Sequence, residues 1–197
     1  MRQYLYILTF CCVLVFYGCE SKQTVQKVLR KSYGKQINLK LPMQYVFEDT
    51  TLDAISQPEL PPIKVVVYIS GQLCAPCLRN YLSTTSDYID EFSSDSVQYI
   101  CVMYPRPIEE IQEAMDSLEL PQTVVLYDKG DQYLKKNSLE KYTDMFRAFL
   151  LDKDNQVVLV GDPLRSTDLQ KLYTEKIREL IANGGKLPKK NFFRKKR

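Results

Sequence analysis

Hydrophobic positions along this chain follow two different spacings. The apolar run at residues 65–69 is continuous, rich in β-branched side chains and too short for a typical helix, so it predicts a buried strand. Residues 37–41 alternate between apolar and polar side chains, the pattern of a half-buried strand. Further strands are predicted over residues 97–104, 123–127, 146–152 and 157–160, and turn residues at 152–155 join the last two as a hairpin.

Segments with helical spacing of apolar residues lie between and after these strands. Thr50 or Thr51 is a candidate cap for a short helix that reaches about residue 55, ahead of three prolines that interrupt the chain. In chain order, the other helices are predicted from residue 78 to about 92, over 108–118, over 131–139 and from about 167 to 182. Strands and helices therefore alternate along most of the sequence.

The two ends of the chain differ from its middle. The apolar run at residues 4–17 is shorter than the ~20 residues that a membrane-spanning helix needs, so residues 1–18 are predicted to be an export signal. The polar residues 19–36 are interpreted as a tether, and the folded domain is expected over residues 37–185. The tail at 186–197 is expected to be disordered. It carries seven basic residues and no acid, so an anionic lipid surface is a possible ligand and simple solvation is the alternative.

Cysteine usage narrows the chemistry. The six cysteines divide into three in or next to the leader (Cys11, Cys12 and Cys19) and three in the predicted domain (Cys74, Cys77 and Cys101). One pair and an odd thiol are not a disulfide scaffold, and Cys101 is expected to be a buried, inert thiol in a strand. Without a histidine, the chain excludes Cys–His and Ser–His catalysis. No metal site and no cofactor are expected.

The motif Cys74-Ala75-Pro76-Cys77 lies where the central strand ends and a helix begins, just after a turn around Gly71. Free backbone N–H groups and the helix dipole stabilise an anion at such a position, and the thiolate is the reactive form of cysteine. Pro76 suits the first helical turn, where its missing N–H is no loss. A redox-active pair, a structural disulfide and half of a zinc site are all compatible with the motif, although zinc lacks histidine and a second CxxC.

The order of strand, CxxC and helix resembles the thioredoxin superfamily, and in particular the TlpA-like thiol–disulfide oxidoreductases of bacterial envelopes. The resemblance spans about residues 39–182 and rests on element order more than on identity. It implies an α/β, thioredoxin-like fold with a central mixed sheet flanked by helices. It also implies that Cys74 is the exposed nucleophile and Cys77 the resolving thiol, one turn further inside. The implied substrates are cysteine-containing exported proteins, and a further redox partner, unknown here, would recharge the pair.

The resemblance also predicts a substrate groove formed by Ala75, Pro76 and Arg147. Members of the superfamily usually carry a cis-proline before the hairpin strand, and the corresponding position here is Arg147. Its preceding peptide bond is expected to be trans, because a cis bond before a non-proline residue costs about 3–4 kcal/mol. An arginine there could lower the pKa of Cys74 by its charge. The alternatives are that Arg147 points to solvent or that the register is different.

Two further positions depart from the family pattern. The acid that many thioredoxins carry six residues before the first cysteine is replaced by Tyr68, and the frequent tryptophan before that cysteine is replaced by Leu73. A second function therefore stays open, a non-catalytic thioredoxin-like binding module with a structural or vestigial disulfide. A peroxiredoxin is disfavoured, because the threonine expected three residues before its reactive cysteine is Gly71.

The sequence Gly18-Cys19 at the end of the leader resembles the lipobox of bacterial lipoproteins. The resemblance implies that Cys19 becomes the lipidated N-terminus and anchors the protein in the bacterial cell envelope. An ordinary secretory signal and an uncleaved anchor are the alternatives. Nucleic acid is not expected as a partner, because an exported lipoprotein rarely meets it.

Overall fold

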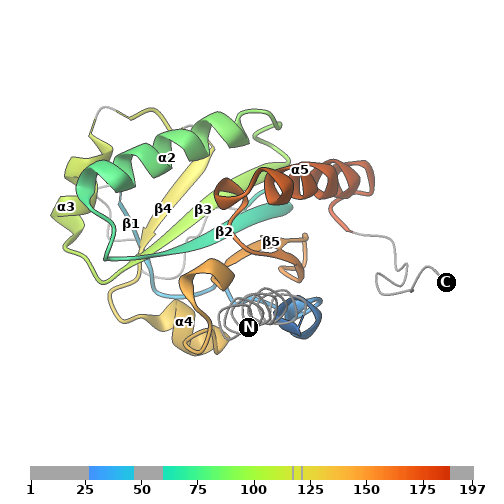
Figure 1. The fold of residues 1–197 in the computed structure, drawn as a ribbon, viewed down its shortest axis with the longest axis horizontal. Coiled ribbons are helices and arrows are strands. Elements are labelled where there is room, and N and C mark those ends of the chain that lie inside the picture. Colours follow the sequence, from blue (N-terminus) through green and yellow to red (C-terminus); the bar gives the residue numbers. More distant parts are fainter. Residues whose placement is uncertain (1–26, 47–59, 117, 121, 187–197) are drawn as a thin grey trace, which may run out of the picture.

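A computed structural model of the chain describes residues 27–46, 60–116, 118–120 and 122–186. Six strands form one mixed sheet in the order β1-β4-β3-β2-β5-β6 (Figure 1). In the sheet β2, β3 and β4 run parallel, whereas β1, β5 and β6 pair antiparallel to their neighbours. The strands are β1 (Gln44–Tyr45), β2 (Ile63–Ser70), β3 (Val97–Tyr104), β4 (Thr123–Tyr127), β5 (Ala148–Leu151) and β6 (Val157–Val160).

Helices cover both faces of this sheet. Figure 1 shows α2 and α5 over one face and α4 on the opposite side. The helices are α2 (Ala75–Ile89), α3 (Ile108–Met115), α4 (Gln132–Asn137) and α5 (Thr167–Ala182), with short 3-10 turns η1 (Asp144–Phe146) and η2 (Pro163–Arg165). None of the helices in the described residues is long and apolar enough to cross a membrane. The predicted α/β fold with a central mixed sheet is confirmed.

The central strand β2 explains why its sequence is apolar without interruption. Val65, Val67 and Ile69 enter the core cluster that contains α2 and α5 side chains, whereas Val66 and Tyr68 enter the cluster on the other face. Because both faces are covered, every position from Ile63 to Ile69 is buried, including Lys64. A strand in this situation needs apolar residues on both sides.

Most predicted elements are present, and three strands have the predicted bounds. The largest difference concerns β5, which begins at Ala148 rather than at residue 146 because Asp144–Phe146 form a 3-10 turn. The predicted helices at 78–92 and 108–118 are real, but end at Ile89 and Met115. The short helix expected near residue 55, the export signal with Cys19, and residues 187–197 of the tail lie outside the described residues.

The strand predicted over residues 37–41 is wrong as a strand, although the burial it implied is present. Ile37, Leu39 and Leu41 are buried, but the segment carries no ladder, and the N–H of Leu41 donates instead to the carbonyl of Leu39 at 3.0 Å. The side-chain amide of Asn137 takes the place of a neighbouring strand. It accepts from the Asn38 N–H at 2.7 Å and donates to the Asn38 carbonyl at 3.0 Å.

Residues ahead of position 37 also pack against the domain. Residues 27–32 are helical, and Val28 and Leu29 contact the core cluster on the α4 side of the sheet. The Gly34 N–H donates to the carbonyl of Val157 at 2.8 Å. The packed part of the chain therefore starts before the predicted domain boundary at residue 37, inside the segment interpreted as a tether.

Candidate active site

Cys74 and Cys77 form a disulfide at the N-terminus of α2, with their Cα atoms 5.0 Å apart. Cys74 is the N-cap of the helix, and its Sγ accepts a hydrogen bond from the Cys77 N–H at 3.2 Å. Pro76 lies in the first helical turn, as its missing N–H permits. The prediction that the two cysteines lie within disulfide range at a helix N-terminus is confirmed.

The four residues of the motif form an exposed cap on the domain. Cys74, Ala75, Pro76 and Cys77 are all exposed, and burial begins at Leu78. The expected difference between an exposed Cys74 and an inner Cys77 is therefore not a difference between an exposed and a buried residue. What distinguishes the two sulfurs is the hydrogen bond at Cys74, because a donor aimed at a sulfur favours its thiolate form.

The loop that leads into the motif is held by the segment after β3. β2 and β3 are parallel and pair Ser70 with Tyr104, so their C-terminal ends lie side by side. The Gly71 N–H donates to the Tyr104 carbonyl at 3.2 Å, and the Tyr104–Pro105 peptide bond is cis. A Cβ on Gly71 would lie 1.7 Å from the Pro105 carbonyl oxygen, so the contact requires glycine.

Arg106 completes this contact, and the sequence alone did not identify it. Its Nη2 donates to the carbonyl oxygen of Gly71 at 3.1 Å and also to that of Leu73. The residue directly follows the predicted strand at 97–104. A pairing of the parallel strands drawn from the sequence would have placed it beside the CxxC loop.

Arg147 has the backbone that the sequence predicts and a different set of partners. The cis peptide bond among the described residues is Tyr104–Pro105, and the bond before Arg147 is trans. Its guanidinium forms an ion pair with Asp144 at 2.8 Å, donates to the Glu140 carbonyl at 3.2 Å and lies 5.4 Å from the centre of the Tyr68 ring. The side chain is only 16% exposed, so it does not point to solvent.

Tyr68, at the position of the missing acid, points to the face of the sheet away from α2. Its hydroxyl lies 3.1 Å from the Tyr104 carbonyl and 3.1 Å from Oδ1 of Asp131, and its ring stacks on Tyr133. Burial, and then the nearby Asp131 carboxylate, raise the pKa of Tyr68 well above its usual value. The residue is therefore a neutral hydrogen-bond donor and does not replace the acid as a proton acceptor.

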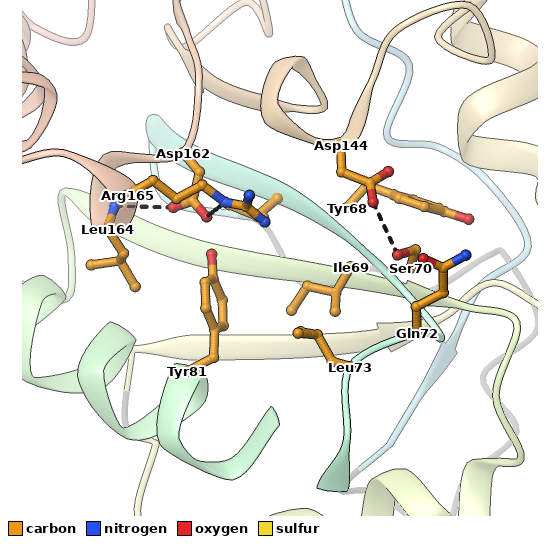
Figure 2. A pocket seen from close by; sticks show the side chains of 11 residues that line it. Tyr68, Ile69, Ser70, Gln72, Leu73, Tyr81, Asp144, Asp162, Leu164 and Arg165 are labelled. Atoms are coloured by element: carbon orange, nitrogen blue, oxygen red, sulfur yellow. Dashed lines mark hydrogen bonds and ion pairs between the residues drawn. The ribbon is translucent and has the colours of Figure 1, made fainter. Parts of the chain in front are cut away.

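A cavity of 360 Å³ opens beside the motif, on the α2 face of β2 and next to Leu73. Figure 2 shows the hydroxyl of Tyr81 pointing toward Asp162 and Arg165, and Asp144 bonded to Ser70. The lining residues come from β2, the loop before α2, α2 itself, η1 and η2: Val67, Tyr68, Ile69, Ser70, Gln72, Leu73, Tyr81, Asp144, Asp162, Leu164 and Arg165. Of the three predicted groove residues, Ala75 and Pro76 lie on the cap and Arg147 lies behind Asp144.

Asp162 is the buried acid of this cavity, and sequence reasoning missed it. It is 4% exposed and accepts from the Leu164 N–H at 3.0 Å and from Nε of Arg165 at 3.4 Å. Both bonds are local to η2, so Asp162 caps that turn. The Asp-Pro pair before the last helix was the available sequence signal.

Cys101 is a free cysteine, and it is fully buried in β3, as predicted. Burial, and then the negative charge of Asp162, raise the pKa of this thiol well above its usual value. A neutral, inaccessible thiol does not take part in exchange. Among the described residues, no group of three or more cysteine, aspartate or glutamate side chains is placed to hold a metal ion.

Comparisons with known proteins agree with this geometry at the level of the fold. No protein-family model and no curated protein matches the sequence. A conserved uncharacterised protein from Geobacillus kaustophilus matches with a TM-score of 0.55 and 15% identity, over 81% of this chain and 86% of the other. A thioredoxin-like protein from Porphyromonas gingivalis matches with a TM-score of 0.51 and 14% identity, over 78% and 95%.

A thiol-disulfide isomerase from Corynebacterium glutamicum matches with a lower TM-score of 0.46 and 18% identity, over 71% of this chain and 96% of the other. Together with the sheet order and the cysteine pair at the start of α2, the two higher-scoring matches show what the architecture is. The chain has the thioredoxin fold.

Proposed function

We propose that this protein is a thiol–disulfide oxidoreductase that exchanges disulfides with cysteine-containing proteins through Cys74 and Cys77. The observation that supports this proposal most directly is the exposed Cys74–Cys77 disulfide at the N-terminus of α2. A structural disulfide gains most when it closes a long loop. This one closes a loop across three positions of the sequence, within a helical turn that is already formed, so its contribution to stability is small.

The exchange follows from the geometry of the pair. In the reduced protein the Cys74 thiolate attacks one sulfur of a substrate disulfide, a mixed disulfide forms, and one substrate thiolate leaves and takes up a proton. The Cys77 thiol then loses its proton and attacks Sγ of Cys74, which releases the second substrate thiol and closes the Cys74–Cys77 bond. Two electrons pass to the substrate, and a partner dithiol returns them. The same steps in reverse oxidise a substrate dithiol.

The proposed location is the bacterial cell envelope, where Cys19 would carry lipid and the substrates would be exported proteins. This part rests on the sequence of residues 1–19, which lie outside the described residues. Mass spectrometry of the protein from its native host tests it. A diacylated or triacylated Cys19 at the N-terminus supports the proposal, and an intact leader or an unmodified Cys19 contradicts it.

Exchange is tested by trapping. The chain without its first 19 residues is reduced and incubated with insulin or with a small aromatic disulfide, and thiol release is followed. We expect wild type to turn over and Cys74→Ser to be inactive. Cys77→Ser should stop at a mixed disulfide through Cys74, visible as a mass increase. Cys101→Ser, which removes the buried thiol, is the matched control and should retain turnover.

The second candidate function is a non-catalytic binding module, and the replaced family positions favour it. Tyr68 is not a proton acceptor and Arg147 replaces the cis-proline, so two elements that assist turnover are altered. A Cys74–Cys77 bond that stays oxidised against excess dithiothreitol, together with absent turnover, would establish the binding module and exclude the oxidoreductase.

A further inference from the structure

Arg106 lies under the loop that enters the CxxC motif. Its Nη2 is hydrogen-bonded to the carbonyl oxygens of both Gly71 and Leu73, and its side chain is 10% exposed. The Leu73 carbonyl belongs to the peptide group that joins Leu73 to Cys74. A guanidinium that stays charged at any ordinary pH is therefore one peptide group away from the proposed nucleophile.

The position of Arg106 is set by the backbone on both sides. The register of β2 and β3 places Ser70 beside Tyr104, and Gly71 donates from its N–H to the Tyr104 carbonyl. The Pro105 carbonyl lies so close to Gly71 that no side chain fits between them. The guanidinium cannot move away from the loop unless these contacts separate.

The charge of Arg106 is only weakly compensated by its ion-pair partner. That partner, Glu110, has a side chain that is 55% exposed and lies 3.7 Å away. Arg147, in contrast, is paired with Asp144 at 2.8 Å. The field of Arg106 thus acts on the CxxC loop with less cancellation than the field of Arg147, because exposed ion pairs at long distance are screened by water.

We propose that Arg106 is a positioning residue that fixes the 71–73 loop and stabilises the Cys74 thiolate of the reduced protein. The proposal rests on the proposed exchange at Cys74 and names what tunes it. Reduction of the Cys74–Cys77 bond takes up two electrons from a thiol reductant. Near neutral pH it takes up one proton, on Cys77, when Cys74 stays a thiolate. A cation that stabilises this thiolate stabilises the reduced form, so the disulfide becomes more oxidising.

The test measures the pKa of Cys74 and the redox equilibrium, without any protein substrate. The thiolate absorbance of the reduced protein is titrated with pH, and the Cys74–Cys77 pair is equilibrated with reduced and oxidised glutathione at pH 7. For Arg106→Gln we expect the pKa of Cys74 to rise by about one unit. The equilibrium should move roughly three- to tenfold toward the disulfide.

Three further variants separate charge from structure. Arg106→Lys keeps the charge and loses the planar pair of donors, so its pKa shift should be less than half of that of Arg106→Gln. Glu110→Gln removes the opposing charge and should shift the pKa of Cys74 slightly downward. Arg178→Gln makes the same charge change on the exposed face of α5, away from the motif, and should leave both readouts unchanged.

Equal pKa shifts in Arg106→Gln and Arg106→Lys would overturn the electrostatic role, as would an unchanged pKa in folded Arg106→Gln. If Arg106→Gln fails to fold, the sign of the Glu110→Gln shift decides, and an upward or absent shift overturns the proposal. Insulin turnover of the same proteins is recorded separately. An inactive wild type whose thiol pKa still responds to Arg106 contradicts the proposed function and leaves the role of Arg106 intact.

Discussion

Two loops meet at the C-terminal end of β2, and each contributes an arginine that is used in a different way. On the β3 side, Arg106 spends its donors on backbone carbonyls of the CxxC loop. On the β5 side, Arg147 is bound by the Asp144 carboxylate and lies against the Tyr68 ring. The comparison shows that the influence of a cation on a thiol depends on what already neutralises it, and not on which family position it occupies.

The two loops are also attached to β2 with different tolerance. The β3 side is a contact between backbones, in which Gly71 meets Pro105 without room for a side chain. The β5 side is a contact between side chains, in which the Ser70 hydroxyl donates to Asp144 at 3.1 Å. Side chains can adjust, whereas a backbone contact cannot. Substitutions on the β3 side should therefore cost more.

The largest effect is expected from Gly71→Ala. Its Cβ would lie 1.7 Å from the Pro105 carbonyl oxygen, so the two loops must separate and the bonds of Arg106 must break with them. We expect the free energy of unfolding to fall by about 3 kcal/mol, at the upper end of overpacking substitutions. Urea unfolding of the oxidised protein measures it.

Gly130→Ala is the matched control for Gly71→Ala. There the new Cβ would meet the mobile end of the Gln132 side chain at 3.0 Å, which can move aside. We expect a loss of less than about 1 kcal/mol. Equal losses in the two variants would show that the Gly71–Pro105 contact is not a rigid attachment of the motif.

A smaller effect is expected from Arg147→Met, which keeps the length of the side chain and removes its charge. The variant loses the bond to Asp144 and the contact with the Tyr68 ring, which together correspond to about 1–2 kcal/mol of unfolding free energy. Because Asp144 already neutralises Arg147, the pKa of Cys74 should shift less than in Arg106→Gln. Thiolate titration of both variants measures this, and an equal shift would return the role of the active-site cation to Arg147.

The sequence predicted the sheet well because burial and period carry most of the information there. Strands β3, β4 and β6 are continuous apolar runs in a sheet covered on both faces, and their predicted bounds match. The CxxC junction was predictable for a similar reason. A buried strand, a glycine turn and a proline in the first helical turn are all local signals.

Contacts between distant segments were not predictable from period. Residues 37–41 have the alternation of a strand, yet the amide of Asn137 satisfies the Asn38 backbone where a strand would. Arg106 has no motif of its own, and its role depends on the register between β2 and β3. In both places a side chain bonds to backbone far away in the sequence, and hydrophobic pattern does not record such bonds.

The smallest effect is expected on the Arg147 side of the comparison, at Asp131. This residue adopts a left-handed conformation with φ of 55° and accepts from the Tyr68 hydroxyl at 3.1 Å. Burial raises the pKa of Asp131, and the nearby Asp128 raises it further, against the opposing effects of Tyr68, Lys135 and Arg147. The folded protein thus disfavours the ionised carboxylate.

The sign of the pH dependence follows from the raised pKa. The stability that this carboxyl contributes is fully present below its unfolded pKa of about 3.9 and is lost as pH rises through the higher folded pKa. Asp131→Asn cannot ionise, keeps the acceptor oxygen and tolerates the left-handed backbone. We expect the variant to gain a few tenths of a kcal/mol, about the scale of a partly exposed charge, at pH 7.

Urea unfolding of the oxidised wild type and Asp131→Asn between pH 3 and 7 measures the difference. The stability gain of the variant should shrink as pH falls below the unfolded pKa, because both proteins then carry a neutral group at position 131. A gain of the same size at every pH would assign the effect to the left-handed backbone, where asparagine is at ease, and would remove charge from the account. A loss of stability at pH 7 would show that the ionised carboxylate is favoured by Arg147, which would make the charges on the two sides of the motif less separate than their contacts indicate.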